Sequence, residues 1–180
     1  MRNQCRMMLV VSTWLLAAGP GTQAWAQVRE SLRPAQTEFV DLKRGAESAL
    51  AKGDAAKALE LAKQANRRMP DDLETYSLLV LAYLKLGRID DAERQAQWML
   101  DIRIEHPLSL LRTADVREAI GQWDGAMAML SEAFGRVKTP LEKAEILLHG
   151  AEIQRKAGRA ESAKRLMDEA RKLVPEESEK

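Results

Sequence analysis

The chain has 180 residues, with 28 Lys and Arg against 27 Asp and Glu, one Cys and 4% aromatic residues. This length suits one domain with its own core, and a formal net charge of +1 supplies no excess of cations for wrapping nucleic acid. A single Cys excludes a disulfide framework and any zinc site built on cysteines, and the low content of Gly and Pro leaves room for long helices.

Residues 1–26 have the pattern of an export signal. Two arginines precede a mostly apolar run over 7–18, which is short for a membrane span of about 20 residues. The Gly-Pro-Gly sequence at 19–21 is expected to break any helix, and Ala-Trp-Ala at 24–26 fits a cleavage site. We therefore predict a signal peptide that is cleaved after Ala26, and a periplasmic or secreted protein. An uncleaved N-terminal anchor is the alternative.

Cleavage would change the composition of the working protein. It would remove two Arg, no acidic residue and the one Cys, which leaves a net charge of −1 and no cysteine. Such a chain is compatible with an oxidising compartment, although it has no cysteines that could form disulfide bonds there. Residues 27–38 contain Pro34 and are predicted to be either a linker or a short N-terminal capping helix.

The rest of the chain repeats at intervals of 34 to 37 residues. Four glycines each lie between two stretches with helical periodicity: Gly53, Gly87, Gly121 and Gly158. The fifth residue after each glycine is alanine: Ala58, Ala92, Ala126 and Ala163. Seven places further on stand Ala65, Met99, Ala133 and Ala170. These columns predict paired helices that cross closely, where a larger side chain would hold them apart.

The period, the small-residue columns and the prolines that close the first and last units (Pro70 and Pro175) resemble the tetratricopeptide repeat. In this register the units are 39–72, 73–106, 107–140 and 144–177, followed by a charged tail at 178–180. The large aromatic residue favoured in the second helix is replaced by Ala62, Ala96, Leu130 and Met167. The resemblance implies an all-α fold, a right-handed solenoid of about four helix-turn-helix repeats, and a protein-binding function without catalysis or cofactor.

Capping residues predict where individual helices begin. Asp54 and Asp124 are expected to cap the second helices of the first and third units. Asp90, with Glu93 three residues on, predicts a capping box in the second unit. Thr139-Pro140-Leu141-Glu142 predicts another one at the start of the fourth unit, with Pro at the first helical position.

No set of residues predicts catalysis, since the sequence has neither a phosphate-binding glycine loop nor a nucleophile elbow. His149 has Glu145 and Glu152 at helical spacing, but three such residues on one helix face are more typical of surface charge than of a metal site. We therefore predict no metal ligand. Trp98 and Trp123 are expected to pack between neighbouring units, with an exposed binding anchor as the alternative.

The resemblance places the first helix of each unit on a concave groove. The groove residues it implies are Lys43, Arg44, Glu47, Ser77, Leu78, Leu81, Leu84, Lys85, Leu108, Leu111, Arg112, Asp115, Leu148, His149, Glu152 and Arg155. An apolar middle with charged ends suits an amphipathic helix or an extended segment, although several of the leucines could instead pack between helices. The two-carboxylate clamp of some relatives is disfavoured, because Glu47 and Leu78 occupy places where it needs Asn.

The expected function is a protein–protein interaction scaffold in the bacterial periplasm. It would bind a peptide or helix in the groove and aid assembly of an envelope complex for secretion, pilus formation or polysaccharide export. Two alternatives stay open at this point: a self-assembling structural repeat protein, and a membrane-tethered adaptor if the N-terminal segment is kept. The partner is expected to be another protein or peptide, and not nucleic acid.

Overall fold

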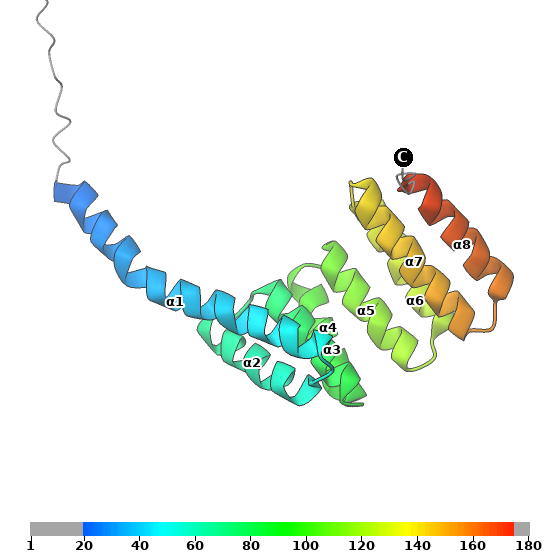
Figure 1. The fold of residues 1–180 in the computed structure, drawn as a ribbon, viewed down its shortest axis with the longest axis horizontal. Helices are drawn as coiled ribbons and strands as arrows, with labels where there is room; N and C mark the ends of the chain where they lie inside the picture. The colour runs from blue at the N-terminus through cyan, green and yellow to red at the C-terminus, as the bar shows by residue number, and fades with distance from the viewer. Residues whose placement is uncertain (1–19, 175–180) are drawn as a thin grey trace, which may run out of the picture. The chain divides into compact units, whose positions relative to one another are not determined.

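The computed structural model describes residues 20–174, with side chains from residue 36 onward. This part of the chain forms eight α-helices joined by turns (Figure 1). They are α1 (Pro20–Ala51), α2 (Ala55–Arg68), α3 (Leu73–Lys85), α4 (Ile89–Ile102), α5 (Pro107–Ala119), α6 (Trp123–Arg136), α7 (Pro140–Lys156) and α8 (Ala160–Leu173). The chain divides into two compact units, Met1–Gln36 and Thr37–Lys180. None of the helices described is both long enough and apolar enough to cross a bilayer.

The first unit differs from the sequence expectation where it is described. The segment 19–21 does not prevent a helix, because α1 begins at Pro20 and continues through Gly21. A proline in the first turn of a helix loses no intrahelical hydrogen bond, so it can start the helix rather than break it. Residues 27–38 are helical as well, and they belong to a helix of 32 residues rather than to a linker or a short capping helix. The apolar run at 7–18 lies outside the described residues, and cleavage after Ala26 stays a prediction.

The second unit consists of helical hairpins. The C-terminal part of α1 packs on α2, and α3 with α4, α5 with α6 and α7 with α8 form the next three pairs. Each pair also contacts the next one, through α2 with α3, α4 with α5 and α6 with α7 (Figure 1). The predicted fold class, an all-helical repeat solenoid, is confirmed.

Each hairpin turns at one of the four repeated glycines. Their φ angles are 81°, 70°, 75° and 76°, in the left-handed region that strains any residue with a side chain. At Gly87, its own N–H donates to the Leu84 carbonyl at 3.0 Å, and the N–H of Arg88 donates to the Tyr83 carbonyl at 2.9 Å. The other three turns have the same pair of bonds. The glycines therefore end the first helices and satisfy their last carbonyl groups.

Small side chains fill the crossings of the helices. The alanines in the first column are Ala58, Ala92 and Ala126, all without exposed surface, and Ala163, which is 6% exposed.

The two tryptophans with described side chains pack against the helical core. Trp98 stacks on Tyr76 with ring centroids 3.7 Å apart and packs against the core of the first two repeats. Trp123 packs against the core of the third and fourth. Both tryptophans are therefore packed against the core, and the stacking partner of Trp98 belongs to its own unit.

Two of the predicted caps are present. The Asp54 carboxylate accepts the backbone N–H of Lys57 at 3.0 Å, which caps α2. Thr139 and Glu142 form the reciprocal bonds of a capping box at the start of α7. Both caps satisfy backbone N–H groups that the first turn of a helix leaves without partners.

The predictions for Asp90 and Asp124 are wrong. The N-cap of α4 is Arg88 and that of α6 is Gln122, and neither makes a side-chain capping bond. The reason is the turn itself, since each second helix begins two residues after the glycine and the residue between them becomes the N-cap. Asp90 and Asp124 lie instead in the first turns, where a negative charge is favourable at the positive end of the helix dipole.

Candidate functional site

The first helices of the second, third and fourth repeats line two open hollows. One hollow lies at the C-terminal ends of these helices, and we call it the C-terminal hollow; the other lies toward their N-terminal ends, and we call it the N-terminal hollow. The C-terminal hollow has a volume of about 420 Å³ and is lined by Leu81, Leu84, Lys85, Asp115, Glu118, Ala119 and Lys156, from α3, α5 and α7. The N-terminal hollow has a volume of about 460 Å³ and lies mainly between α5 and α7. Its lining is His106, Pro107, Leu108, Leu111, Arg112, Val137, Glu142, Glu145, Ile146 and His149.

The hollows bring together half of the sixteen groove residues named from the sequence. The C-terminal hollow contains Leu81, Leu84, Lys85 and Asp115, and the N-terminal hollow contains Leu108, Leu111, Arg112 and His149. The four leucines are half-buried, so each both contacts its neighbours and keeps surface open to the hollow. Both hollows are therefore lined by apolar leucines together with charged side chains.

The other eight residues lie elsewhere. Ser77 and Leu78 are 5% and 7% exposed, so they offer little surface to a partner. Three of the others form pairs within their own helix: Arg155 donates to Glu152 at 2.6 Å and 2.9 Å, and Arg44 donates to Asp41 at 3.2 Å. Lys43 forms ion pairs with Glu74 and with Asp72, the latter at 3.1 Å. Leu148 and Glu47 are exposed outside both hollows.

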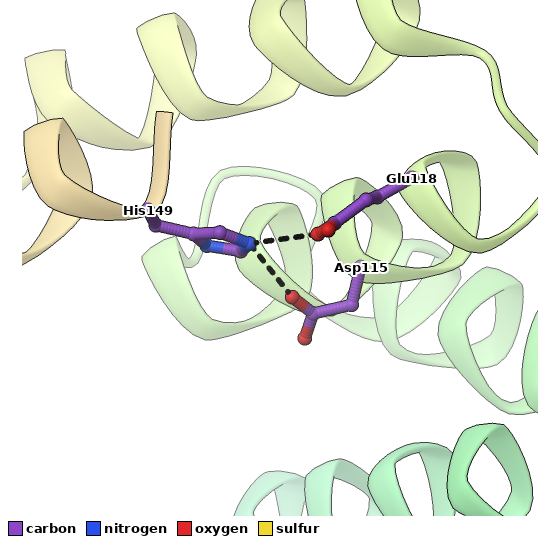
Figure 2. A group of neighbouring side chains, drawn as sticks. All are labelled: Asp115, Glu118 and His149. Carbon is purple, nitrogen blue, oxygen red and sulfur yellow. Dashed lines mark hydrogen bonds and ion pairs between the residues drawn. The ribbon is translucent and has the colours of Figure 1, made fainter. Parts of the chain in front are cut away.

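Three side chains meet between the hollows, and we call them the carboxylate–imidazole cluster: Asp115 and Glu118 of α5 and His149 of α7 (Figure 2). The His149 Nε2 atom lies 3.2 Å from Glu118 Oε2 and 3.3 Å from Asp115 Oδ1. Both carboxylate side chains are 14% exposed and the imidazole is 27% exposed. The cluster joins the third repeat to the fourth.

Cations flank the cluster on both sides. The second oxygen of Asp115 pairs with Arg112, and that of Glu118 pairs with Lys156 at 2.5 Å. Arg112 also donates from Nε to the Ser77 hydroxyl at 2.8 Å, which ties α5 to α3. Burial raises the pKa of the Asp115 carboxyl above its ordinary value, because the opposing attraction of Arg112 and His149 does not fully offset the loss of water.

The partners of His149 were missed from the sequence. Helical spacing pairs His149 with Glu145 and Glu152 on its own helix, whereas the structure places its Nε2 atom on Asp115 and Glu118 of the preceding repeat. The sequence carries one usable signal, since Asp115 is the ninth residue of the third unit and His149 is the sixth of the fourth, so the two lie within one helical turn of equivalent places in successive first helices. Equivalent places in stacked repeats lie side by side.

Comparisons with known proteins agree with this architecture. Residues 49–97 match the sequence model of the tetratricopeptide repeat. A thermophilic tetratricopeptide-repeat protein of Thermus thermophilus has a similar structure, with a TM-score of 0.70 and 24% identity over 87% of this chain and 89% of that one. The pilF protein of Pseudomonas aeruginosa has a TM-score of 0.65 and 13% identity, over 78% of this chain and 63% of its own.

A tetratricopeptide-repeat domain from a third organism has a similar fold. The Sgt2 tetratricopeptide-repeat domain of Aspergillus fumigatus has a TM-score of 0.51 and 18% identity, over 77% of this chain and 80% of the domain. No curated protein matches the sequence. At these identities the solved structures establish the fold.

The helical hairpins, the glycine turns and the open surface on the first helices define a repeat scaffold for protein–protein interaction. Residues 49–97 match the tetratricopeptide-repeat family, and the chain has the fold of solved tetratricopeptide-repeat proteins. Proteins of this family are in general non-catalytic scaffolds that bind other proteins or peptides.

Proposed function

We propose that this protein is an exported scaffold of the bacterial periplasm. It holds a peptide or an amphipathic helix of a partner protein against α3, α5 and α7, and thereby aids assembly of an envelope complex. Export is supported by the signal-like sequence of residues 1–26. The binding role is supported by the fold and by the two hollows on the first helices.

The observation that carries the proposal is the make-up of those hollows. Four half-buried leucines, two in each, present apolar surface that no other part of the described chain covers fully. Lys85 stands exposed at the rim of the C-terminal hollow. An apolar floor with a charged rim matches an amphipathic helix, whose apolar stripe fills the floor while its polar residues meet the rim.

The test compares what the protein captures with and without this surface. The full chain and a Leu81→Glu/Leu111→Glu variant are expressed in the native bacterium and used for affinity capture from envelope extracts. A carboxylate in each hollow would have to be buried without a partner, so capture is expected to fall at least about tenfold. Circular dichroism establishes that both proteins are helical and melt cooperatively.

A matched control places the same charges elsewhere. Ile104 and Met167 are 66% and 40% exposed and lie outside both hollows. An Ile104→Glu/Met167→Glu variant should therefore capture the same proteins as the parent. Equal capture by the parent and by the groove variant would contradict binding at α3, α5 and α7. If light scattering shows that the particle mass of the purified protein increases with its concentration, and no partner is captured, the result would indicate self-assembly instead.

Cellular location is tested separately. Mass spectrometry of the protein isolated from the periplasmic fraction should show a chain that begins at Gln27. A protein that keeps residues 1–26 and sediments with membranes would contradict export as a cleaved protein and would favour the tethered adaptor.

A further inference from the structure

The carboxylate–imidazole cluster has more acceptors than its imidazole can serve. A nitrogen of an imidazole ring carries at most one proton, yet two carboxylate oxygens converge on Nε2 of His149. Their distances of 3.2 Å and 3.3 Å are both longer than the 2.7–2.9 Å or so of a charge-assisted hydrogen bond. One shared N–H leaves both carboxylates incompletely satisfied.

The two carboxylates are held so that they meet at this point. Arg112 binds the outer oxygen of Asp115, and Lys156 binds the outer oxygen of Glu118. The inner oxygens, Oδ1 and Oε2, both turn toward the imidazole (Figure 2). The two cations therefore hold the carboxylates in this orientation, as supporting residues do around metal ligands.

We propose that Asp115 Oδ1, Glu118 Oε2 and His149 Nε2 together bind one divalent transition-metal ion, preferentially Zn²⁺. Ligand atoms about 2.1 Å from an ion lie about 3.0–3.4 Å apart when neighbouring ligands subtend octahedral or tetrahedral angles. The observed separations of 3.2 Å and 3.3 Å fall in this range, and all three atoms lie within 4.8 Å of one another.

The donor set selects the kind of ion. Imidazole nitrogen with carboxylate oxygen suits Zn²⁺ and its first-row neighbours, whereas Ca²⁺ and Mg²⁺ prefer ligands that are all oxygen. With Nε2 bound to the ion, the proton of the neutral ring is carried by Nδ1. Without an ion, the two carboxylates share one imidazole proton. A bound ion would instead contact both carboxylate oxygens and the imidazole nitrogen directly.

The surroundings give the ion access and room. Asp115 and Glu118 both line the C-terminal hollow, and His149 lines the N-terminal one. Water from these open hollows can complete the coordination of an ion that has three protein ligands. Because Asp115 and Glu118 belong to α5 and His149 to α7, the ion would pin the third repeat to the fourth and fix the spacing of the helices that line both hollows.

The test measures metal content and needs no binding partner. The full chain, freed of any histidine tag and treated with a chelator, is dialysed against ZnCl₂ and analysed by atomic emission. We expect one Zn²⁺ per chain, and a rise in melting temperature with Zn²⁺. The His149→Ala and Glu118→Gln variants each lose a ligand, so their affinity for Zn²⁺ is expected to fall at least about tenfold.

Glu145→Gln is the matched control, because Glu145 lies one turn from His149 on the same helix but outside the cluster. It should retain one Zn²⁺, and circular dichroism on all variants checks that they fold. Absorption of bound Co²⁺ in the visible range provides a second signal, which should vanish in Glu118→Gln. The proposal is overturned if the parent holds no more Zn²⁺ than the dialysis buffer, if His149→Ala and Glu118→Gln retain as much as the parent, or if Glu145→Gln loses the ion.

Discussion

Replacing Gly87 by alanine isolates the backbone cost of the hairpin turns. Gly87 has φ of 70°, and a Cβ atom built there would meet nothing within 4 Å. The substitution therefore introduces no clash, and its effect comes from the backbone alone. A left-handed conformation costs a residue with a side chain about 1–2 kcal/mol, while the stiffer unfolded chain returns about 0.4–1 kcal/mol. The net expectation is a loss of about 1 kcal/mol.

Gly135 supplies the opposite case with the same chemistry. It lies in the last turn of α6 without a positive φ, and a Cβ atom there would also meet nothing within 4 Å. Gly135→Ala should stabilise the protein by about 0.4–1 kcal/mol, because alanine favours the helix and restricts the unfolded chain. The two variants differ by one methyl group each, yet their effects have opposite signs.

Urea unfolding followed by circular dichroism measures both free energies of unfolding. The difference of about 1.5 kcal/mol corresponds to a gap of about 3–6 °C in melting temperature for a chain of this size. The account of the turns would be refuted if Gly87→Ala were as stable as Gly135→Ala, or if Gly135→Ala were the less stable of the two.

Three further changes probe the caps and the core. Thr139→Ala removes the hydroxyl that accepts the Glu142 N–H in the capping box of α7 and should cost about 1 kcal/mol in urea unfolding, so an unchanged midpoint would argue against the box. Ala126→Leu places a large side chain at a position without exposed surface and should cost about 1–3 kcal/mol, whereas Ala128→Leu on the exposed side of α6 should cost little; equal melting of the two variants would contradict the close crossing. Asp72 caps α3, and although burial raises its pKa, hydrogen bonds from Thr75 and the charge of Lys43 outweigh this and lower it below 3.8. Its contribution is therefore present above the ordinary pKa and is lost as pH falls through the lower folded value, so Asp72→Ala should cost about 1 kcal/mol at pH 7 and progressively less in acid. A cost that does not change with pH would refute this assignment.

The repeat architecture could be predicted from the sequence because it depends on residue type at fixed spacing. Gly87 and its three counterparts are needed for a backbone conformation, and the alanine column is needed for close approach. Both constraints act within one hairpin. They are therefore visible in a single chain with a period of 34 residues.

Helix starts were less predictable, because two local rules compete. Asp90 with Glu93 satisfies the capping-box pattern, but the glycine turn fixes the N-cap at Arg88 two residues earlier. The start of α1 has a similar cause, since Pro20 was interpreted as a breaker although the same residue can begin a helix.

The candidate site could not be predicted in the same way, because it is formed by contacts between helices, and the periodicity within one helix carries no information on those contacts. The acidic partners of His149 lie 34 and 31 residues away, on α5, and their distances depend on how the third and fourth repeats stack. Ser77 and Leu78 show the same limit in reverse: the repeat register places them on the groove, but α5 packs against α3 and buries them.

Site-specific photo-crosslinking in the cells that produce the protein tests the central claim most directly. A photoreactive amino acid is placed at Leu81 or Leu111 in the hollows, and at exposed Ala128 or Gln97 on second helices for comparison. The account predicts that the two groove positions form adducts with the same envelope protein while the two second-helix positions form none. Adducts of equal yield from Ala128 and Gln97, or no adduct from either groove position, would contradict a partner held on the first helices.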